Sequence, residues 1–246
     1  MFLKEKRFKA KIRRKNMEII RDAELINYYI KKYKIDEFFT DPSICKQMVI
    51  RQYHKGEYII SPEGVVEQMN FVLEGRAKVY SVSNNGKILL LSFYKPFSIF
   101  GDVEYALKKE TDYIAESLGT SRCLSIDLDC LKEHTKFDVK FKDFMLASIA
   151  KKLNQSASKN MFNLLYPLEN RIAGYIMSIS MEEEEDFVEI FNLKDAAFFL
   201  GSSYRHLIRV LDKLEEKGII RRERKKIYIL DKKALEILAE ELYEWE

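Results

Sequence analysis

The chain has 246 residues, 47% of them hydrophobic and 33% charged, with few glycines and prolines. This composition is typical of a globular protein, and the length is sufficient for two domains. No apolar run approaches the ~18–20 residues of a membrane span, and the basic N-terminus lacks the apolar segment of a secretory signal. The three cysteines (Cys45, Cys123 and Cys130) form neither a disulfide framework nor a CxxC pair. We therefore expect a cytoplasmic protein.

The net charge of +3 is unevenly distributed along the chain. Residues 1–16 contain eight Lys/Arg and one Glu, a charge of +7, so the remainder carries −4. One interpretation is a basic arm that touches nucleic acid. The other is that Met17 is the biological start and that 13–16 translate a purine-rich ribosome-binding site and its spacer. The Lys- and Ile-rich composition of an AT-rich bacterial genome fits this second interpretation, and both stay open.

The spacing of apolar residues in threes and fours predicts a helix over residues 17–40. Asp41-Pro42 is expected to end this helix. We therefore assign residues 1–40 to a basic arm and an N-terminal helix that packs on the next domain.

Residues 41–133 show short β-rich runs separated by turn signals, the pattern of a jelly roll or small barrel. Asn84-Asn85-Gly86 lies between two such runs and favours a hairpin. In the last run, larger residues alternate with small or polar ones, as in a half-buried strand. The expected strands are Tyr58–Ile60, Asn70–Leu73, Ala77–Val82, Ile88–Phe93, Tyr113–Ala115 and Arg122–Leu128.

A segment without glycine or proline, Lys136–Tyr166, predicts a long helix within a region assigned to residues 134–166. At ~1.5 Å per residue this helix would be ~45 Å long, which is difficult to bury on one small barrel. One apolar stripe is therefore expected to pack against a partner subunit, and a single-chain core helix is the alternative. A shorter helix, Leu168–Ser180, is expected after Pro167.

The C-terminal region, residues 167–246, contains the pattern of helix, tight turn, helix and basic hairpin within Phe191–Leu230. A first apolar helix stops at Gly201, Ser202 or Ser203 can cap the next helix, and that helix ends at Gly218. Residues 201–230 hold nine Lys/Arg against four Asp/Glu. A short helix with exposed Tyr, Arg and His, followed by a basic wing, suits a DNA major groove. The alternative is a surface helical hairpin with solvated basic residues.

This order of elements resembles the CRP/FNR family of bacterial transcription regulators. Similar motifs occur at Phe71–Tyr80, at Ile99–Asp102 and at Asn170–Ala173, and PLENRIAGYI and SSYRHLIRVL are most similar to the YeiL-type branch. The resemblance implies an α+β fold. Its parts are a double-stranded β-helix (jelly-roll) domain of the cyclic-nucleotide-binding type, a long dimerisation helix and a C-terminal winged helix-turn-helix.

The resemblance also implies a homodimer on a palindromic double-stranded DNA operator, with half-sites about 34 Å apart. Base reading falls on Tyr204, Arg205 and Arg209, with His206 where the family often has Thr. Arg209 suits guanine, while Arg205 replaces a common Glu, so readout of cytosine from that position should be lost. Phosphate contacts fall on Ser202 and Ser203 at the start of the helix and on Arg224, Lys225 and Lys226 in the wing.

The effector end departs from the family pattern. Cyclic-nucleotide binders carry an Arg-Ser or Arg-Thr pair about ten residues beyond the Gly-Glu of the cassette, to bind the cyclic phosphate. Here Gly101-Asp102 is followed by Thr111-Asp112, Phe97 stands where a loop glycine is usual, and the base-contacting pair on the dimer helix becomes Ser156-Ala157. We therefore expect that cyclic AMP does not bind, and we keep Gly101, Asp102, Thr111, Asp112 and Ser156 as candidates for another effector's pocket.

No cofactor or metal is expected. An FNR-type iron–sulfur cluster needs four thiolates and the chain has three cysteines, while His54, His134 and His206 lack metal-ligand spacing. Cys123 or Cys130 as a redox sensor is weighed against ordinary buried cysteine, which is commoner. RNA polymerase and an unidentified small molecule are further candidate partners.

Three functions therefore compete. The first is a homodimeric DNA-binding regulator whose barrel senses an unidentified molecule or serves as a scaffold. The second is a ligand-binding signalling module of the cyclic-nucleotide type whose C-terminal domain docks protein. An enzyme is not expected, because the sequence shows no nucleophile–base pair, Gly-rich phosphate loop or metal set.

Overall fold

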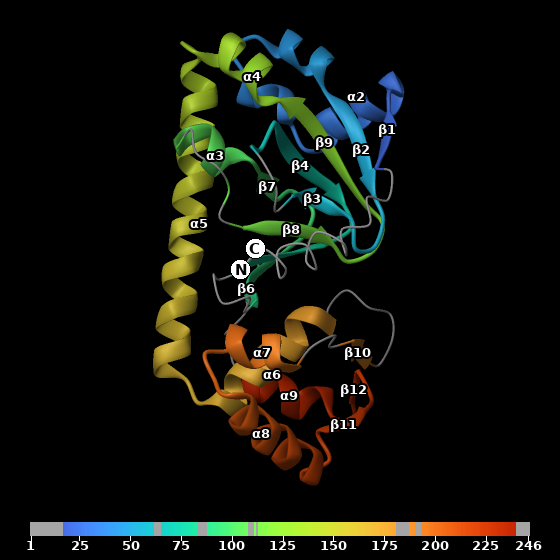
Figure 1. Ribbon diagram of the computed structural model, residues 1–246, viewed down its shortest axis with the longest axis vertical. Helices are drawn as coiled ribbons and strands as arrows, with labels where there is room; N and C mark the ends of the chain where they lie inside the picture. The colour runs from blue at the N-terminus through green and yellow to red at the C-terminus, as the bar shows by residue number, and fades with distance from the viewer. Residues whose placement is uncertain are drawn as a thin grey trace, which may run out of the picture. The chain divides into compact units, whose positions relative to one another are not determined.

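The computed structural model describes residues 17–61, 65–82, 88–107, 111, 113–180, 187–189 and 193–239. These residues form two compact units. One comprises the chain up to Val82 together with Leu91–Lys151, and the other contains the chain from Lys152 onward. The expected α+β class is confirmed, with a two-sheet jelly roll in the first unit and helices with a small sheet in the second (Figure 1). The domain boundaries drawn from the sequence stay a prediction.

Two antiparallel sheets build the jelly roll. The five-stranded sheet has the order β1-β2-β9-β4-β7, with β1 at Glu18–Ile20, β2 at Val49–Tyr53, β9 at Ser121–Asp127, β4 at Gln68–Glu74 and β7 at Ile99–Phe100. The four-stranded sheet has the order β3-β8-β5-β6, with β3 at Tyr58–Ile60, β8 at Ile114–Ser117, β5 at Ala77–Val82 and β6 at Ile88–Tyr94. All six predicted strands are present, whereas β1, β2 and β7 were not predicted.

The five-stranded sheet is covered on both faces. In the middle of β4 and β9, successive residues, which point to opposite faces, are buried: Met69–Leu73 of β4 and Cys123–Ile126 of β9. One face therefore lines the jelly roll, and the other packs against helices. On that outer face Phe38 stacks on Phe71 with ring centroids 6.4 Å apart.

The prediction of one helix over residues 17–40 is wrong at both ends. Residues 18–20 form the edge strand β1, the helix α2 spans only Ala23–Lys32, and a short 3₁₀ turn, η1, covers Ile35–Phe38. The helix starts where it does because the Asp22 carboxylate accepts the backbone N–H of Glu24 and Leu25. A second 3₁₀ turn, η2 at Pro42–Gln47, follows.

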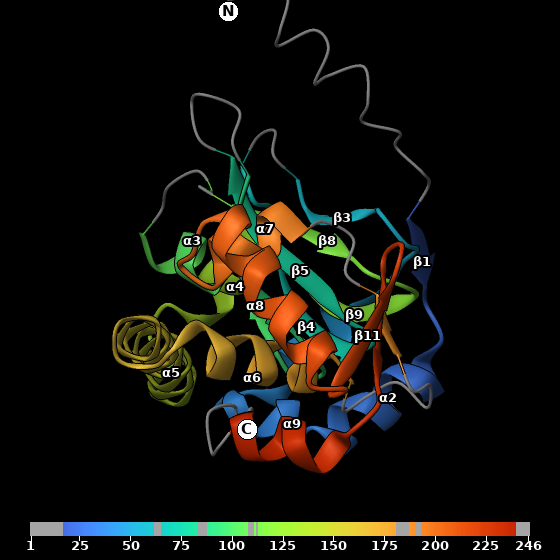
Figure 2. The same ribbon diagram turned by 90° about the horizontal axis from the view of Figure 1, so that it is seen from below.

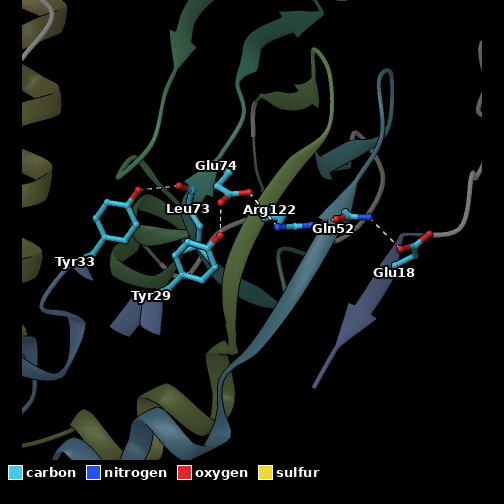
Figure 3. A network of polar contacts seen from close by, with 7 residues as sticks. All are labelled: Glu18, Tyr29, Tyr33, Gln52, Leu73, Glu74 and Arg122. Atoms are coloured by element: carbon cyan, nitrogen blue, oxygen red, sulfur yellow. Dashed lines mark hydrogen bonds and ion pairs between the residues drawn. The ribbon is translucent and has the colours of Figure 1, made fainter. Parts of the chain in front are cut away.

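A row of polar contacts fastens this N-terminal segment to the outer face of the sheet (Figure 3). Glu18 of β1 accepts from Gln52 of β2, and Gln52 in turn accepts from Arg122 of β9 at 2.9 Å. Arg122 donates to Glu74 of β4, which also accepts the hydroxyl of Tyr29 from α2. In the same view, the Tyr33 hydroxyl donates to the Leu73 carbonyl at 2.8 Å. The row crosses four strands and ends on the helix, so α2 is held by directional bonds as well as by packing.

The loop before β7 holds a non-glycine residue in the left-handed region. Phe97 has φ 66°, and its N–H donates to the Val72 carbonyl at 2.7 Å. Its ring is only partly exposed, because it stacks on Tyr33 at 5.2 Å and lies 6.0 Å from Phe38. These contacts offset a backbone strain of about 1–2 kcal/mol.

The first unit also contains α3 at Asp102–Leu107, α4 at Leu128–Thr135 and the first half of the long α5 at Val139–Leu165, which continues into the second unit from Lys152. The predicted long helix is confirmed, but it begins three residues later than the apolar pattern indicated. Asp138 stands before it as a cap and accepts N–H bonds from Phe141 and from Thr40. Thr40 thereby ties the start of α5 to the N-terminal segment.

The long helix carries two different apolar stripes. Near its start Phe141 and Met145 are buried in the core, and Phe38 stacks on Phe144 with centroids 4.0 Å apart. A second stripe is solvent-exposed, with exposed fractions from 57% to 85% in the list that follows. It comprises Val139, Leu146, Leu153, Met161, Leu164 and Leu165.

The second unit contains four helices and a small sheet among its described residues. The helices are α6 at Leu168–Ser180, α7 at Leu193–Phe199, α8 at Tyr204–Glu216 and α9 at Lys232–Ala239. The antiparallel sheet has the order β10-β12-β11, with β10 at Phe187–Glu189, β11 at Ile220–Glu223 and β12 at Lys226–Ile229. The predicted helix-turn-helix and basic hairpin are confirmed. The basic arm 1–16 and the turn 84–86 lie outside the described residues.

Candidate nucleic-acid interface

The tight turn between α7 and α8 is closed by backbone hydrogen bonds. The Ser202 N–H donates to the Ala197 carbonyl at 2.8 Å, and the Gly201 N–H donates to the Phe198 carbonyl at 3.0 Å. This pair of bonds is the Schellman motif, which needs a left-handed residue at the position of Gly201. Gly201 has φ 61°, so the predicted role of this glycine is confirmed.

Ser203 caps the second helix of the motif. Its hydroxyl accepts the backbone N–H of His206 at 3.2 Å, which resolves the choice between the two serines. The Ser202 hydroxyl instead donates to the Ser203 carbonyl at 3.3 Å. Both serines therefore lie at the N-terminus of α8, where free N–H groups and the helix dipole favour an anion.

The helix α8 separates its two faces cleanly. Its buried side consists of Leu207, Val210, Leu211 and Leu214. The opposite side is exposed over the first two turns and presents Tyr204, Arg205, His206 and Arg209. The structure therefore brings all four predicted base-reading side chains onto one exposed surface of one helix.

Side chains of helix α6 bond to the helices of the helix-turn-helix and to α9. The buried guanidinium of Arg171 donates to the carbonyl of Leu200 at the end of α7, and the Asn170 amide donates to Leu238 of α9 at 3.0 Å. The ammonium of Lys217, just after α8, lies 2.6 Å from Glu169. The Asn170-Arg171 pair is therefore explained by its bonds to backbone carbonyls of two other helices.

The basic hairpin presents its charges unevenly. Arg224 and Lys225 form the exposed turn between β11 and β12, and Arg224 has φ 54°. The Lys226 ammonium lies 3.6 Å above the ring of Phe187, and the guanidinium of Arg221 lies 4.8 Å from the Tyr228 centroid. Of the three predicted phosphate contacts in the wing, Arg224 and Lys225 extend furthest into solvent, and Lys226 rests on an aromatic ring.

Arg222 behaves differently from the other basic residues of the hairpin. Its guanidinium binds Glu215 and Asp212 of α8, beside which β11 lies in Figure 2. By sequence Arg222 is one more basic residue of the wing, and this pairing was not predicted. Asp212 and Glu215 precede it by ten and seven residues, and that spacing is the only signal that could have indicated it.

Comparisons with known proteins agree with this geometry. A family model described as a cyclic nucleotide-binding domain matches residues 50–136, and one described as a Crp-like helix-turn-helix domain matches residues 170–238. The chain belongs to the CRP/FNR family. It is therefore a CRP/FNR-type transcription regulator with a helix-turn-helix DNA-binding domain, not an enzyme.

Individual relatives of the regulator are distant. It is 25% identical over 207 residues to the regulatory protein YeiL of Escherichia coli O157:H7, a match that covers 84% of this chain and 92% of that protein. A structure assigned to the CRP/FNR family from Eubacterium rectale ATCC 33656 is 19% identical, with a TM-score of 0.70 over 80% of this chain and 91% of that one. A CRP/FNR-family regulator from Thermus thermophilus is 24% identical, with a TM-score of 0.56 over 77% and 97%. These two structures support the fold alone.

The regulator's predicted effector residues are largely engaged within the barrel itself. Gly101 has φ 89°, and a Cβ there would lie 2.5 Å from the Gln68 carbonyl oxygen, so glycine is required by the backbone. Asp102 is fully buried and accepts the Ser148 hydroxyl of α5 at 3.2 Å. The Thr111 hydroxyl is used locally, because it donates to the Tyr113 carbonyl and accepts the Tyr113 N–H.

The other two effector candidates are Ser156 and Asp112. Ser156 is exposed on the part of α5 that belongs to the second unit. Asp112 lies outside the described residues. An effector pocket made of these five residues stays a prediction. A carboxylate that the sequence analysis did not single out, Glu104 of α3, is also buried and accepts the Tyr113 hydroxyl at 3.1 Å.

The cysteines differ in their accessibility. Cys123 is fully buried, and burial raises its pKa far above that of a free thiol. Burial likewise raises the pKa of Cys45 to about 11. Cys130 is partly exposed, and its Sγ lies 3.7 Å from Nδ1 of His134. Burial keeps Cys123 and Cys45 protonated and unreactive, as for structural cysteines.

Two searches of the described residues found nothing. No group of three or more His, Cys, Asp or Glu side chains in the described ranges could hold a metal ion. No helix in the part of the chain that the structure describes is both long and apolar enough to span a membrane.

Proposed function

We propose that the regulator acts as a homodimer that recognises a palindromic operator with inverted half-sites. The observation that carries the proposal is the exposed surface of α8, where Tyr204, Arg205, His206 and Arg209 project from a helix whose opposite face is buried. A helix of this kind enters the major groove with its first turns facing the base edges.

Each side chain has a distinct expected contact. Arg209 binds guanine O6 and N7 through its fork of donors, and Arg205 replaces an acceptor of cytosine N4 with a donor. Ser202 and Ser203 bind phosphate at the helix start, where the dipole favours an anion. Arg224, Lys225 and Lys226 bind backbone phosphates from the wing and so carry no sequence information.

The exposed stripe of α5 supports the dimer. Val139, Leu146 and Leu153 repeat every seven residues, so they fall on one side of the helix, and Leu146 and Leu153 are about 70% exposed. Large aliphatic side chains in a continuous exposed stripe are typical of a helix that pairs with another. The partner we propose is the same helix of a second copy.

We further propose that the barrel does not bind cyclic AMP. A cyclic phosphate buried in a protein needs a fixed cation, and this chain has Thr111-Asp112 where the family's nucleotide binders carry arginine. The same cassette contains two buried acidic residues, Asp102 and Glu104, and neither can supply the cation that a phosphate needs. The barrel either senses a different small molecule or serves as a scaffold. The site of action is the cytoplasm, where DNA and RNA polymerase are available.

Selection of bound sequences from random DNA, with and without cell extract, tests the proposal. The expected outcome is an inverted repeat with half-sites one helical turn apart, bound with an affinity that falls steeply as salt rises. Retention of unrelated sequences with no symmetry would contradict it, as would monomers in sedimentation at micromolar concentration. A calorimetric titration with cyclic AMP is expected to show no heat of binding, and micromolar affinity would overturn that part.

A further inference from the structure

The hairpin is joined to the recognition helix by a very short connection. After α8, the Ile219 N–H donates to the Leu214 carbonyl at 3.0 Å and the Gly218 N–H to the Glu215 carbonyl at 2.9 Å. Gly218 takes φ 69°, and β11 begins two residues later at Ile220. The chain thus reverses in a single turn, and the wing is attached to α8 at that one covalent point.

A second attachment is made by one side chain. The Arg222 backbone N–H donates to one oxygen of Glu215 at 2.7 Å, and its Nε and Nη2 donate to the other oxygen at 3.0 and 2.7 Å. Nη2 also donates to Asp212, one turn earlier on α8. One arginine therefore joins the strand β11 to two successive turns of the recognition helix.

These contacts leave Arg222 unsuited to gripping phosphate. Its side chain is only 24% exposed, and two carboxylates already bind its Nε and Nη2. Hydrogen bonds from the Arg222 backbone N–H and guanidinium hold the pKa of Glu215 below its usual range, so this partner stays ionised at neutral pH. By contrast, Arg224 and Lys225 at the hairpin turn are exposed. A paired, planar guanidinium is well suited to fix geometry, because its fork of donors matches a carboxylate in one orientation.

We propose that Arg222 is a positioning residue for operator recognition: by binding Glu215 and Asp212 it sets the place of the wing relative to α8, so that the wing reaches phosphates when α8 reads bases. The inference rests on the proposed DNA-binding function and extends it. Arg222 itself does not contact the DNA. Base reading and phosphate gripping are thereby coupled through a network that lies on the protein side of the interface.

The test uses a substitution for which two possible roles of Arg222, positioning the wing and binding phosphate, predict opposite changes in operator affinity. Glu215→Gln in the full-length protein removes a negative charge from α8 and replaces one of the two oxygens that accept bonds from Arg222 with an amide NH2 group. If Arg222 positions the wing, operator affinity falls about three- to tenfold and the salt dependence becomes shallower, since wing phosphate contacts are weakened. If Arg222 is a phosphate ligand, its release strengthens binding and raises the salt slope by about 0.9. The second result would overturn the proposal.

Glu216→Gln is the matched control. Glu216 is the neighbouring, exposed residue of α8 and takes no part in the Arg222 network. Its substitution removes the same charge, so operator binding should stay the same or strengthen slightly. Weakening equal to that of Glu215→Gln would assign the effect to charge rather than position, and would contradict the proposal.

A double-mutant cycle tests the coupling between sites that do not touch. In the wild-type background Lys225→Ala should weaken binding severalfold. In the Glu215→Gln background it should have almost no effect, because the wing is already displaced. Arg222→Lys, which keeps the charge but loses the fork, should show the same loss of coupling. Additive effects would reject the proposal.

Hydrogen exchange distinguishes a failure of the positioning role of Arg222 from a failure of the proposed DNA-binding function. In the free protein, Glu215→Gln should speed exchange of the amides of β11 and β12 about tenfold and leave those of α6 unchanged. Unchanged exchange in the wing would overturn the positioning role. If the wild-type protein bound no DNA, the proposed function would fail, and the exchange result alone would decide whether Arg222 fixes the wing.

Discussion

The two units of this regulator use their polar side chains in opposite ways. On α8 the side chains proposed to read bases, Tyr204, Arg205 and Arg209, face solvent, because the apolar residues of the helix lie on its opposite, buried side. In the barrel Asp102 and Thr111 are bonded to Ser148 and Tyr113 of the same unit. The side chains of α8 that are proposed to contact DNA have no need of partners within the protein. The two barrel side chains are hydrogen-bonded in the fold itself. The difference shows that the proposed DNA contacts are free to meet a partner from outside, whereas Asp102 and Thr111 already have partners within their own unit.

The largest effect on the stability of the barrel is expected from Gly101→Ala. The new Cβ would lie 2.5 Å from the Gln68 carbonyl oxygen at a residue with φ 89°. Left-handed strain and overpacking together should lower the free energy of unfolding of this unit by about 2–5 kcal/mol. Gly56→Ala is the control, since Gly56 has φ 84° but open space at Cβ, and it should cost only about 1–2 kcal/mol. Equal losses in denaturant titrations would show that the close approach does not matter.

On the outward-facing side the sharpest change is Arg209→Ala. Losing a bidentate guanine contact should weaken operator binding by about 1–3 kcal/mol and relax specificity at one base pair. Lys225→Ala should instead weaken all sequences about equally and reduce the salt slope by about 0.9. Binding to an array of single-base operator variants measures both. The assignment of α8 fails if the two variants give the same profile.

A smaller effect is expected where the N-terminal helix meets the barrel. Tyr29→Phe removes the hydroxyl that donates to Glu74 and should lower stability by about 1.5 kcal/mol. Tyr28→Phe, at an exposed neighbouring position, should stay within about 0.5 kcal/mol of the wild type. Urea unfolding monitored by circular dichroism measures both. No difference between them would mean that packing alone holds α2.

The smallest expected effect is on the loss of stability at acid pH. Partial burial alone would raise the pKa of Asp138, but hydrogen bonds from the Thr40 hydroxyl, the Thr40 N–H and the Phe141 N–H hold that pKa below its usual range. A lowered pKa means that the stabilisation is complete above about pH 4 and is lost as the pH falls through the folded value.

Asp138→Asn should accordingly remove this part of the acid sensitivity, an effect below about 1 kcal/mol at this partly exposed site. Stability curves of both proteins from neutral pH to about pH 2, below the ordinary range of a carboxyl group, measure it. Parallel curves would show that the Asp138 bonds contribute nothing to the pH dependence.

Local sequence predicted most elements of both units, and the failures have a common cause. Residues 18–20 form a strand because Ile19 and Ile20 lie opposite Arg51 and Ile50 of β2, a pairing that apolar spacing within residues 17–40 does not encode. The strand β2 itself was missed because Arg51 and Gln52 interrupt its apolar pattern. In both strands, pairing with a neighbour distant in sequence decides the structure where the local pattern does not.

The candidate DNA site was predictable from sequence because its determinants are local. Gly201, Ser203 and Arg209 lie within nine consecutive residues, and one turn and one helix place them. Arg222 was not predictable in the same way. In the sequence Arg222 is a basic residue of the same hairpin as Arg224 and Lys225. Only the fold of the hairpin back onto α8 shows that its charge is already paired.

Phe97 has an evolutionary consequence. Its left-handed backbone is tolerated only because the ring lies against Tyr33 and Phe38, so the three positions are not free to drift separately. Replacement of Phe97 by glycine would relieve the strain, but Tyr33 would keep its bond to the Leu73 carbonyl and Phe38 its stacking on Phe144. Related sequences with phenylalanine at 97 should therefore retain aromatic residues at 33 and 38, whereas glycine at 97 removes only one of the reasons to keep them.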